Sequence, residues 1–375
     1  MPPSLPAPMP PCTHAYIIPI FAIINTIAMD LEKTNRTELS ELGEFGLIDL
    51  LTNNITLVNK SSVCGVGDDA AVIDNKGKLT LVSTDLLVEG VHFDLSYTPL
   101  KHLGYKAAVA NISDIVAMNG KARQLLVGLS VSSRFPVEAL EELYSGIRQA
   151  CQVYHVDLVG GDTTSSVRGL FLSVTVVGEA EPGEVVMRNT ARENDLICVT
   201  GDLGAAYMGL LLLEREKAAF QGDPNLQPDL EGYDYILERQ LKPEPRTDII
   251  RLLKEAVVKP TAMIDISDGL GSEILHICND SKLGCRIYEE KIPIDPTTVN
   301  MAAIFNIGPV TAALNGGEDY ELLFTIDQKD FEKVRSIPGI SVIGHMTDLA
   351  QGAHLMTGDG QLLEIRAQGW NALRK

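Results

Sequence analysis

Aspartate residues follow apolar segments of this chain repeatedly, in each case beside glycine, serine or threonine. These residues are Asp68, Asp69, Asp85, Asp162, Asp265 and Asp268. A further one, Asp114, falls within a predicted helix, where aspartate is a poor helix former. A single Asp-Gly is most often a turn residue, but loops at strand ends also carry many sites of α/β proteins. The recurrence indicates a site built from several carboxylates.

Carboxylates that converge need something to offset their charge. Two of them about 4 Å apart repel by roughly 4 kcal/mol at an effective dielectric constant near 20. Oxygen ligands without histidine or cysteine favour Mg²⁺, which usually shares its other positions with water and substrate phosphates. If the carboxylates converge in space, the sequence therefore predicts a magnesium-dependent site for a nucleotide.

The elements that must position these residues alternate between strands and helices. The hydrophobic patterns predict strands at 79–84, 124–131, 153–159, 170–177, 196–200, 320–326 and 341–343, and helices at 103–118, from 136 onward, at 203–216 and at 246–258. The polar segment 179–183 is the predicted domain boundary, and 223–234 is predicted to be an exposed loop. A chain of 375 residues with this pattern is predicted to form two mixed α/β halves.

Composition and missing motifs exclude several classes of protein. The chain has 31 Lys and Arg against 50 Asp and Glu, a net charge of −19, which argues against nucleic acid or an anionic membrane as a partner. Its six cysteines are scattered without a CxxC pair, so we expect reduced thiols of a cytoplasmic protein rather than a zinc site. The P-loop, the three-glycine dinucleotide motif, the protein-kinase motifs and GxSxG are all absent from the sequence.

The first 28 residues differ from the rest of the sequence. They are Pro-rich and then apolar, and basic residues do not precede the apolar run as they would in a secretory signal. Our hypothesis is that 1–28 is a non-native or disordered extension and that translation starts at Met29. A cleaved export signal is the alternative. An intact-mass measurement that retained Met1 would contradict the hypothesis.

Five motifs, in order along the chain, resemble the thiamine-monophosphate kinase family of the aminoimidazole-ribonucleotide synthetase-like superfamily. They are Gly65-Val-Gly-Asp-Asp-Ala-Ala-Val72, Ser83-Thr-Asp-Leu-Leu-Val-Glu-Gly-Val-His-Phe93, Gly160-Gly-Asp-Thr-Thr164, Ile264-Asp-Ile-Ser-Asp-Gly-Leu270 and Gly316-Gly-Glu-Asp-Tyr-Glu-Leu322. The resemblance extends from about Gly43 to the C-terminus. Segment 239–246 also resembles the family, but we assign it no role from the sequence.

The resemblance implies a two-domain α/β fold with mixed sheets. In this fold, 38–180 would be an N-terminal domain that binds ATP and Mg²⁺ and forms a homodimer, and 181–375 would be a C-terminal α/β domain. It also implies transfer of the γ-phosphate of ATP to thiamine monophosphate, assisted by several Mg²⁺ ions. No covalent nucleophile or general base is expected, because a phosphate oxygen of the substrate is already ionised.

The matched motifs also imply roles for individual residues. The expected metal ligands are Asp69, Ser83, Thr84, Asp85, Asp114, Asp162, Asp265 and Asp268. The expected ATP contacts are Gly161, Arg188 and Ser267, although Arg188 could equally be a surface arginine. The expected contacts to thiamine monophosphate are His92, Glu318 and Trp370.

Two other interpretations stay open at this point. The chain could be another ATP-dependent enzyme of the same superfamily, acting on a different substrate. It could also be a non-enzymatic domain that binds divalent cations. Incubation with Mg-ATP and thiamine monophosphate would distinguish all three interpretations.

Overall fold

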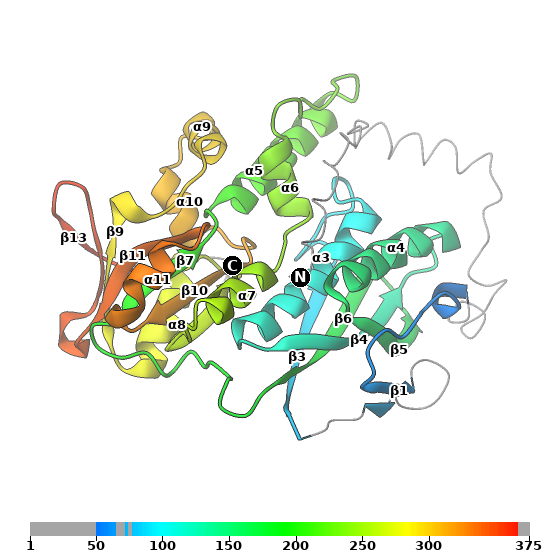
Figure 1. Ribbon diagram of the computed structural model, residues 1–375. Coiled ribbons are helices and arrows are strands. Elements are labelled where there is room, and N and C mark those ends of the chain that lie inside the picture. Colours follow the sequence, from blue (N-terminus) through cyan, green and yellow to red (C-terminus); the bar gives the residue numbers. More distant parts are fainter. Residues whose placement is uncertain (1–49, 65–71, 74–76, 367–375) are drawn as a thin grey trace, which may run out of the picture.

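A computed structural model describes residues 50–64, 72–73 and 77–366 of the chain, and places them around two large β-sheets (Figure 1). A short antiparallel pair precedes both sheets, formed by β1 (Ser62–Cys64) and β2 (Val72–Ile73). The first large sheet and its helices are built from residues 79–180. The second sheet is built from residues 196–364.

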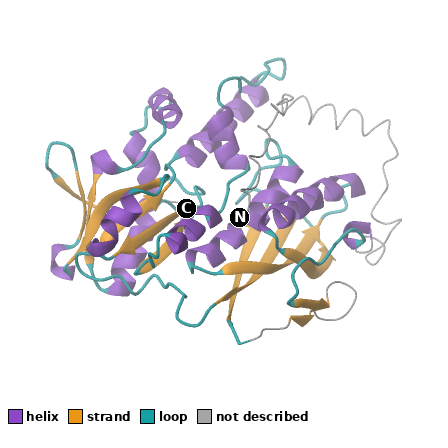
Figure 2. Cartoon of the chain, in the orientation of Figure 1, coloured by secondary structure: helices purple, strands orange, loops and turns teal. Residues whose placement is uncertain are grey.

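The first sheet has four strands in the order β3-β6-β4-β5. Its elements are β3 (Leu79–Val88), α3 (Leu100–Ala117), β4 (Lys121–Val131), α4 (Val137–Tyr154), β5 (Asp157–Ser165) and β6 (Leu170–Ala180). Strand β6 pairs antiparallel with both β3 and β4, and β4 pairs parallel with β5. Helix α3 packs on the sheet and α4 packs on α3, as Figure 2 shows in purple over orange.

Two glycines let these helices cross closely. A Cβ atom at Gly104 of α3 would lie 2.0 Å from the carbonyl oxygen of Leu143, and one at Gly146 of α4 would lie 1.8 Å from that of Lys101. Helix α3 is buried on nearly all sides, because it packs on α4, on the first sheet and also on β8 of the second half. It is therefore a main element at which the two halves meet.

The second sheet has seven strands in the order β13-β12-β9-β11-β7-β10-β8. Its strands are β7 (Leu196–Thr200), β8 (Ala262–Ile266), β9 (Gly284–Tyr288), β10 (Glu321–Ile326), β11 (Ile340–Thr347), β12 (Ala353–Met356) and β13 (Leu362–Glu364). Strand β10 is buried along its whole length between β7 and β8. It carries Glu321 at its start, directly after the Gly316-Gly-Glu-Asp-Tyr320 segment.

Helices of the second half pack around this sheet. They are α5 (Ala205–Gly222), α6 (Asp234–Leu241), α7 (Thr247–Glu255), α8 (Leu270–Ser281), α9 (Pro296–Ile304), α10 (Pro309–Asn315) and α11 (Phe331–Arg335), with 3-10 turns η1 (Glu289–Lys291), η2 (Gln328–Asp330) and η3 (Leu349–Gln351). Helices α5 and α6 form a separate apolar cluster with α9 and α10. Among the described residues no single helix has the length and apolarity to cross a membrane; α9 and α10 together, bent by 103°, meet the length and composition test.

The predicted mixed α/β pattern is confirmed, but several boundaries were wrong. Strand β3, predicted at 79–84, continues to Val88, so Asp85 lies inside it, and Asp265 likewise lies inside β8. The strand predicted at 153–159 begins only at Asp157, because α4 continues to Tyr154, and it extends through both glycines to Ser165. Pairing of β5 with β4 outweighs the poor strand preference of Gly160 and Gly161. Asp162 therefore lies inside a strand rather than after one.

Candidate active site

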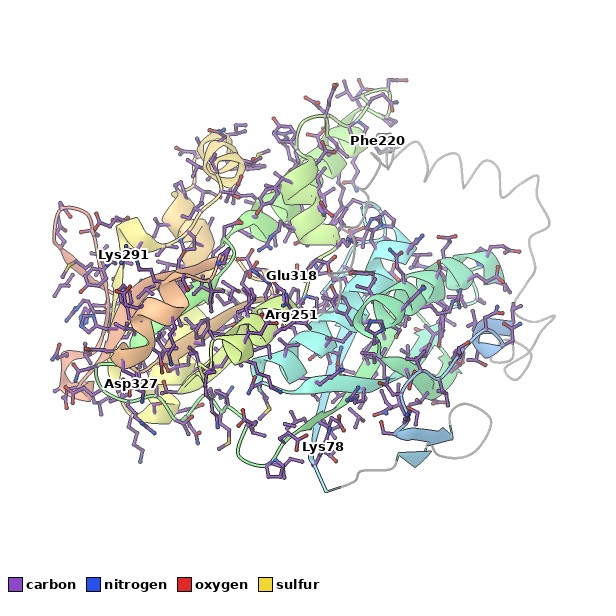
Figure 3. The ribbon with its side chains drawn as sticks, in the orientation of Figure 1. Lys78, Phe220, Arg251, Lys291, Glu318 and Asp327 are labelled. Carbon is purple, nitrogen blue, oxygen red and sulfur yellow. The ribbon has the colours of Figure 1, made fainter. Side chains whose placement is uncertain are left out.

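A cavity of about 930 Å³ lies between the two halves. Its wall includes Asp85 from β3, Asp114 from α3 and Asp265 from β8, and the 317–320 segment completes it. Figure 3 shows Glu318 of that segment between the two halves. Cavities of this size hold most small-molecule ligands of enzymes, so this cavity is the candidate active site.

Asp85, Asp114 and Asp265 form an acidic cluster in this wall, and their charges repel one another. Burial, together with the charges of Asp265 and Asp85, raises the pKa of Asp114 to about 8. Burial also raises the pKa of Asp265 to about 7 and that of Asp85 above its usual value. Burial and mutual repulsion therefore favour the protonated forms of these carboxylates, and a bound cation would offset both effects.

Neighbouring hydroxyl groups orient two of these carboxylates. Ser83 Oγ donates a hydrogen bond of 2.6 Å to Asp114 Oδ2, and Ser113 Oγ donates one of 2.6 Å to Asp265 Oδ2. Thr84 points to the opposite face of the sheet, as the period-2 alternation of a strand requires. There its hydroxyl donates to the carbonyl oxygen of Val174. The Thr84 side chain therefore lies away from the acidic cluster.

Ser267 and Asp268 line the cavity in the turn between β8 and α8. Glu273, in the first turn of α8, accepts the backbone N–H of Asp268 at 2.7 Å and that of Ser267 at 3.2 Å. Glu273 is 2% exposed, and its Oε2 lacks a hydrogen-bond partner among the residues that the structure describes. Glu273 therefore fixes the turn that presents Ser267 and Asp268 to the cavity.

His92 and Glu318 line the same cavity. Burial lowers the pKa of His92, and its Nδ1 accepts the backbone N–H of Val88 at 3.0 Å. Glu318 Oε1 lies 2.9 Å from the buried Lys106 Nζ, while its Oε2 accepts the side-chain amide of Gln240 at 2.9 Å. The carboxylate of Glu318 is thus held from both halves of the molecule.

Besides Thr84, three expected site residues lie away from the wall of this cavity. Asp162 is exposed on β5, and a Cβ atom at Gly161 would lie 1.8 Å from the carbonyl oxygen of Val127, so close strand packing requires glycine there. Arg188 is half exposed and forms an ion pair of 2.6 Å with Asp280. In the single chain these residues do not share the cavity with Asp85, Asp114 and Asp265.

Three further expectations concern residues outside the described part of the chain. They are Asp69 as a metal ligand, Trp370 as a thiamine contact, and the 1–28 extension. Among the described residues, no group of three or more acidic, histidine or cysteine side chains converges closely enough to hold a metal ion unaided. Any ion bound at the described carboxylates therefore needs further ligands.

Comparison with known proteins identifies the family. Residues 67–180 match the model of the AIR synthase related protein, N-terminal domain. A thiamine-monophosphate kinase of Bacillus subtilis is 34% identical over 337 residues, which cover 88% of this chain and 99% of that protein. The chain belongs to the thiamine-monophosphate kinase family. A second member, from Aquifex aeolicus, is 34% identical over 82% of this chain and 96% of its own length.

Solved structures agree with this family and confirm the predicted fold. The thiamine-monophosphate kinase of Stenotrophomonas maltophilia superposes with a TM-score of 0.72 at 30% identity, covering 87% of this chain and 98% of that one. A structure described as AaThiL complexed with AMPPCP and TMP has a TM-score of 0.67 at 32% identity, covering 90% and 99%. The hydrogenase maturation protein HypE shares the fold at 19% identity and a TM-score of 0.66, covering 85% and 94%.

Residues beyond the sequence predictions also shape the site, namely Lys106, Ser113, Gln240 and Glu273. Lys106 could have been found from the sequence, because it is a lysine within an apolar stretch of the predicted helix, and such a lysine needs a partner. Gln240 lies in segment 239–246, to which no role was assigned. Ser113 directly precedes Asp114, a predicted site residue, but its hydroxyl donates a hydrogen bond to Asp265. These contacts join distant segments, so local patterns could not reveal them.

Proposed function

We propose that this chain transfers the γ-phosphate of ATP to thiamine monophosphate, giving thiamine diphosphate and ADP. One observation carries the proposal: Asp85, Asp114 and Asp265, drawn from both halves of the fold, share one cavity with Glu318. Relatives of the same family bear the name of this activity, and AaThiL is complexed with AMPPCP and TMP. The acidic groups would hold cations that neutralise the phosphates of the two substrates, and the carboxylate of Glu318 suits the thiamine cation.

Magnesium is the cation that fits these donors. Asp85, Asp114 and Asp265 offer oxygen atoms only, and the raised pKa values of Asp114 and Asp265 reflect repulsion and burial that a cation offsets. These residues would hold Mg²⁺ together with Asp268, and Asp69 and Ser83 are further proposed ligands. The side chain of Thr84, expected as a ligand from the sequence, faces the other side of the sheet. When bound, Mg²⁺ would neutralise charge on the phosphates of both substrates.

The reaction requires no general base from the protein. A phosphate oxygen of thiamine monophosphate, ionised at neutral pH, forms the new bond to the γ-phosphorus of ATP, while the bond to the β–γ bridging oxygen breaks and ADP leaves. The protein therefore positions two polyanions. Ser83 and Ser113 orient the carboxylates, and Ser267 is a proposed contact to ATP.

Glu318 and His92 are the proposed contacts to thiamine monophosphate. The thiazolium ring is cationic, and Glu318 lines the cavity together with the aromatic residues Tyr207 and Tyr97. His92 lies with them in the wall, and its lowered pKa favours the neutral imidazole. Trp370 is a further proposed contact.

We also propose that the chain forms a homodimer through its first sheet. Helices α3 and α4 pack on one side of this sheet, whereas alternate residues of β3 on the other side, such as Val82 and Leu86, stay exposed. Exposed apolar strand residues favour association with a second copy. Gly161 and Asp162 lie on β5 of the same sheet, so their proposed contacts to ATP and metal belong near that interface.

Other features support the remaining proposals. The first sheet ends with β6 at Ala180 and the second begins with β7 at Leu196, which supports domains at 38–180 and 181–375. Cys151, Cys198, Cys278 and Cys285 are buried free thiols, which supports a cytoplasmic protein. The charge of −19 supports neither nucleic acid nor an anionic membrane as a partner.

A product assay tests the proposal. Purified protein is incubated with ATP, MgCl₂ and thiamine monophosphate, and thiamine diphosphate and ADP are quantified by chromatography. Equal amounts of the two products are expected, with neither formed when EDTA removes the metal. ADP release without thiamine diphosphate would favour a different acceptor, and absence of both from a folded dimer would overturn the proposal.

A further inference from the structure

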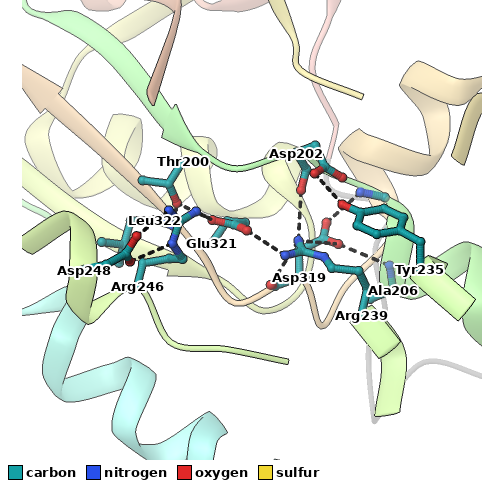
Figure 4. A network of polar contacts seen from close by, with 11 residues as sticks. Thr200, Asp202, Ala206, Tyr235, Arg239, Arg246, Asp248, Asp319, Glu321 and Leu322 are labelled. Atoms are coloured by element: carbon teal, nitrogen blue, oxygen red, sulfur yellow. Dashed lines mark hydrogen bonds and ion pairs between the residues drawn. The ribbon is translucent and has the colours of Figure 1, made fainter. Parts of the chain in front are cut away.

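Segment 239–246, Arg-Gln-Leu-Lys-Pro-Glu-Pro-Arg, connects the end of α6 to the start of α7 and carries two arginines without an assigned role. Both arginine side chains are largely buried, at 17% and 15% exposure for Arg239 and Arg246. Figure 4 shows them on either side of Glu321, the first residue of β10. Buried arginines need specific acceptors, and these contacts show which part of the fold depends on them.

Glu321 is held by both arginines at once. Its Oε1 accepts from Arg239 Nη1 at 2.8 Å, and its Oε2 accepts from Arg246 Nη1 at 2.6 Å and from the hydroxyl of Thr200. Arg246 is itself fixed by Asp248 through two bonds of 3.0 Å. Glu321 is 1% exposed, so these donors replace the water that its carboxylate loses on burial.

Arg239 extends the same network to the segment that precedes β10. Its Nη2 donates to the carbonyl oxygen of Asp202 at 3.0 Å and lies 3.5 Å from that of Asp319. The Asp319 carboxylate accepts the backbone N–H of Gly204 at 2.8 Å. One guanidinium group therefore ties the 316–320 segment to both its neighbouring strand and the loop before α5.

The 316–320 segment needs this restraint because its backbone is strained. Glu318 and Tyr320 have backbone φ angles of 68° and 51°, values that residues other than glycine rarely adopt. Their N–H groups donate to the carbonyl oxygens of Ser267 and Ile266, at 2.7 and 2.9 Å. Strained residues of this kind persist only where the surroundings hold them firmly.

Consecutive residues of α6 contact this part of the chain at two points. Arg239 bonds Glu321, the residue directly after the segment, while Gln240 bonds Glu318 within the segment, at the cavity. Lys106 joins them, because its Nζ donates to the carbonyl oxygen of Gln240 at 3.0 Å and pairs with Glu318. A shift of α6 relative to β10 would therefore move the carboxylate of Glu318.

We propose that Arg239, braced by Arg246 through Glu321, is a positioning residue that holds the strained 316–320 segment so that Glu318 faces the bound cation. The identity of that cation, the thiazolium of thiamine monophosphate, rests on the proposed function. Arg239 itself acts through Glu318 and contacts no substrate. Replacement of Arg239 is therefore expected to weaken the binding of thiamine monophosphate and to leave ATP binding unchanged.

The test compares Arg239→Lys with Arg239→Gln, and both with Arg251→Gln as a matched control. Arg251 is an exposed arginine of α7 whose contact is an ion pair of 2.8 Å with Glu255. Lysine keeps the charge beside Glu321, so this variant is expected to fold. Its single nitrogen cannot reproduce the geometry in which two guanidinium nitrogens contact Glu321 and Asp202. We expect the KM for thiamine monophosphate to rise about tenfold in Arg239→Lys, with the KM for ATP within twofold of wild type.

A double variant separates positioning from general stability. If Arg239 acts through Glu318, Arg239→Gln in a Glu318→Gln background raises the KM for thiamine monophosphate no further than Glu318→Gln alone. Hydrogen exchange gives a readout without turnover: the amides of Glu318 and Tyr320 exchange faster in Arg239→Lys but not in Arg251→Gln.

Three results would overturn the inference. They are unchanged amide exchange at Glu318 and Tyr320 in Arg239→Lys, an equal rise in both KM values, or effects that multiply in the double variant. A wild-type protein that forms no thiamine diphosphate would instead overturn the proposed function. In that case the exchange measurement alone decides whether Arg239 holds the segment.

Discussion

Ser113 Oγ donates a hydrogen bond of 2.6 Å to Asp265 Oδ2, although 152 positions separate the two residues in the chain. Ser113 lies on α3 of the first half and Asp265 on β8 of the second, and both are buried. The next residue of α3, Asp114, accepts instead from Ser83 of β3. One turn of α3 therefore aligns carboxylates from both halves.

Replacement of Ser113 by alanine is expected to weaken magnesium binding. The serine hydroxyl lowers the pKa of Asp265, so its loss leaves a buried carboxylate that holds its proton more tightly. A hydrogen bond to a charged group contributes roughly 1.5–3 kcal/mol, so the half-saturating Mg²⁺ concentration should rise about tenfold or more. Initial rates measured at increasing Mg²⁺ concentrations give this half-saturating concentration. Ser336→Ala, at an exposed serine, is the control, and equal half-saturation in wild type and Ser113→Ala would contradict the prediction.

The metal-free protein is expected to lose stability as the pH rises. The folded-state pKa values of Asp114 and Asp265, about 8 and about 7, lie above the ordinary value of 3.8, because burial disfavours their charged forms. The folded state thus binds protons more tightly than the unfolded chain does. The resulting stabilisation is complete below pH 4 and disappears as the pH rises through 7 to 8, with a slope of up to about 1.4 kcal/mol per pH unit for each group.

Thermal unfolding in EDTA between pH 5.5 and 8.5 measures this effect. The Tm of the wild type should fall more steeply with pH than that of Asp114→Asn, which cannot titrate at that position. Addition of Mg²⁺ at pH 8 should raise the Tm of the wild type more than that of the variant. Parallel Tm curves for the two proteins would show that Asp114 does not carry the raised pKa.

Short sequence patterns predicted which aspartates form the acidic cluster. Asp114 stood out as an aspartate inside an apolar helix, and the structure places it in the cavity wall with Asp85 and Asp265. The alternation of β3 also separates Ser83 from Thr84, a consequence of strand geometry that the motif alone did not specify. Convergence itself was an assumption, because it depends on how α3 packs against β8.

Contacts between distant segments were beyond sequence reasoning. Lys106 and Glu318 form an ion pair although 212 positions separate them in the chain, and Arg239 reaches Glu321 from α6. Neither pairing has a periodic signal, because tertiary packing alone creates it. Tertiary pairing likewise extended β5 beyond Gly160 and Gly161, where local preference predicted that the strand would end.

Asp85→Asn is expected to abolish turnover while the fold stays intact. Burial raises the pKa of Asp85, so the neutral amide removes an unfavourable buried charge and should not lower the Tm. The loss of a carboxylate at the proposed magnesium site should reduce kcat at least about 100-fold. Circular dichroism and the product assay measure the two effects. Asp359→Asn, at an exposed turn, is the control, and near-normal kcat in Asp85→Asn would remove Asp85 from the metal site.

Val82→Asp is expected to dissociate the proposed homodimer without unfolding the chain. Val82 is 65% exposed on the side of β3 that faces away from α3, so an aspartate there is solvated in the single chain. In a dimer that buries this face, the same charge would be desolvated at a cost of several kcal/mol, roughly enough to weaken association 100-fold or more. Sedimentation velocity measures the mass of each variant.

Val153→Asp provides the matched control for that experiment, because Val153 is 52% exposed on α4 and lies on the helical side of the same domain. Dissociation of Val82→Asp but not of Val153→Asp would place the interface on the open face of the first sheet. A dimeric Val82→Asp would exclude that face, since a buried aspartate facing its own copy pairs two like charges. Because Gly161 and Asp162 lie on the same sheet, a monomeric Val82→Asp should also bind ATP more weakly than the wild type does.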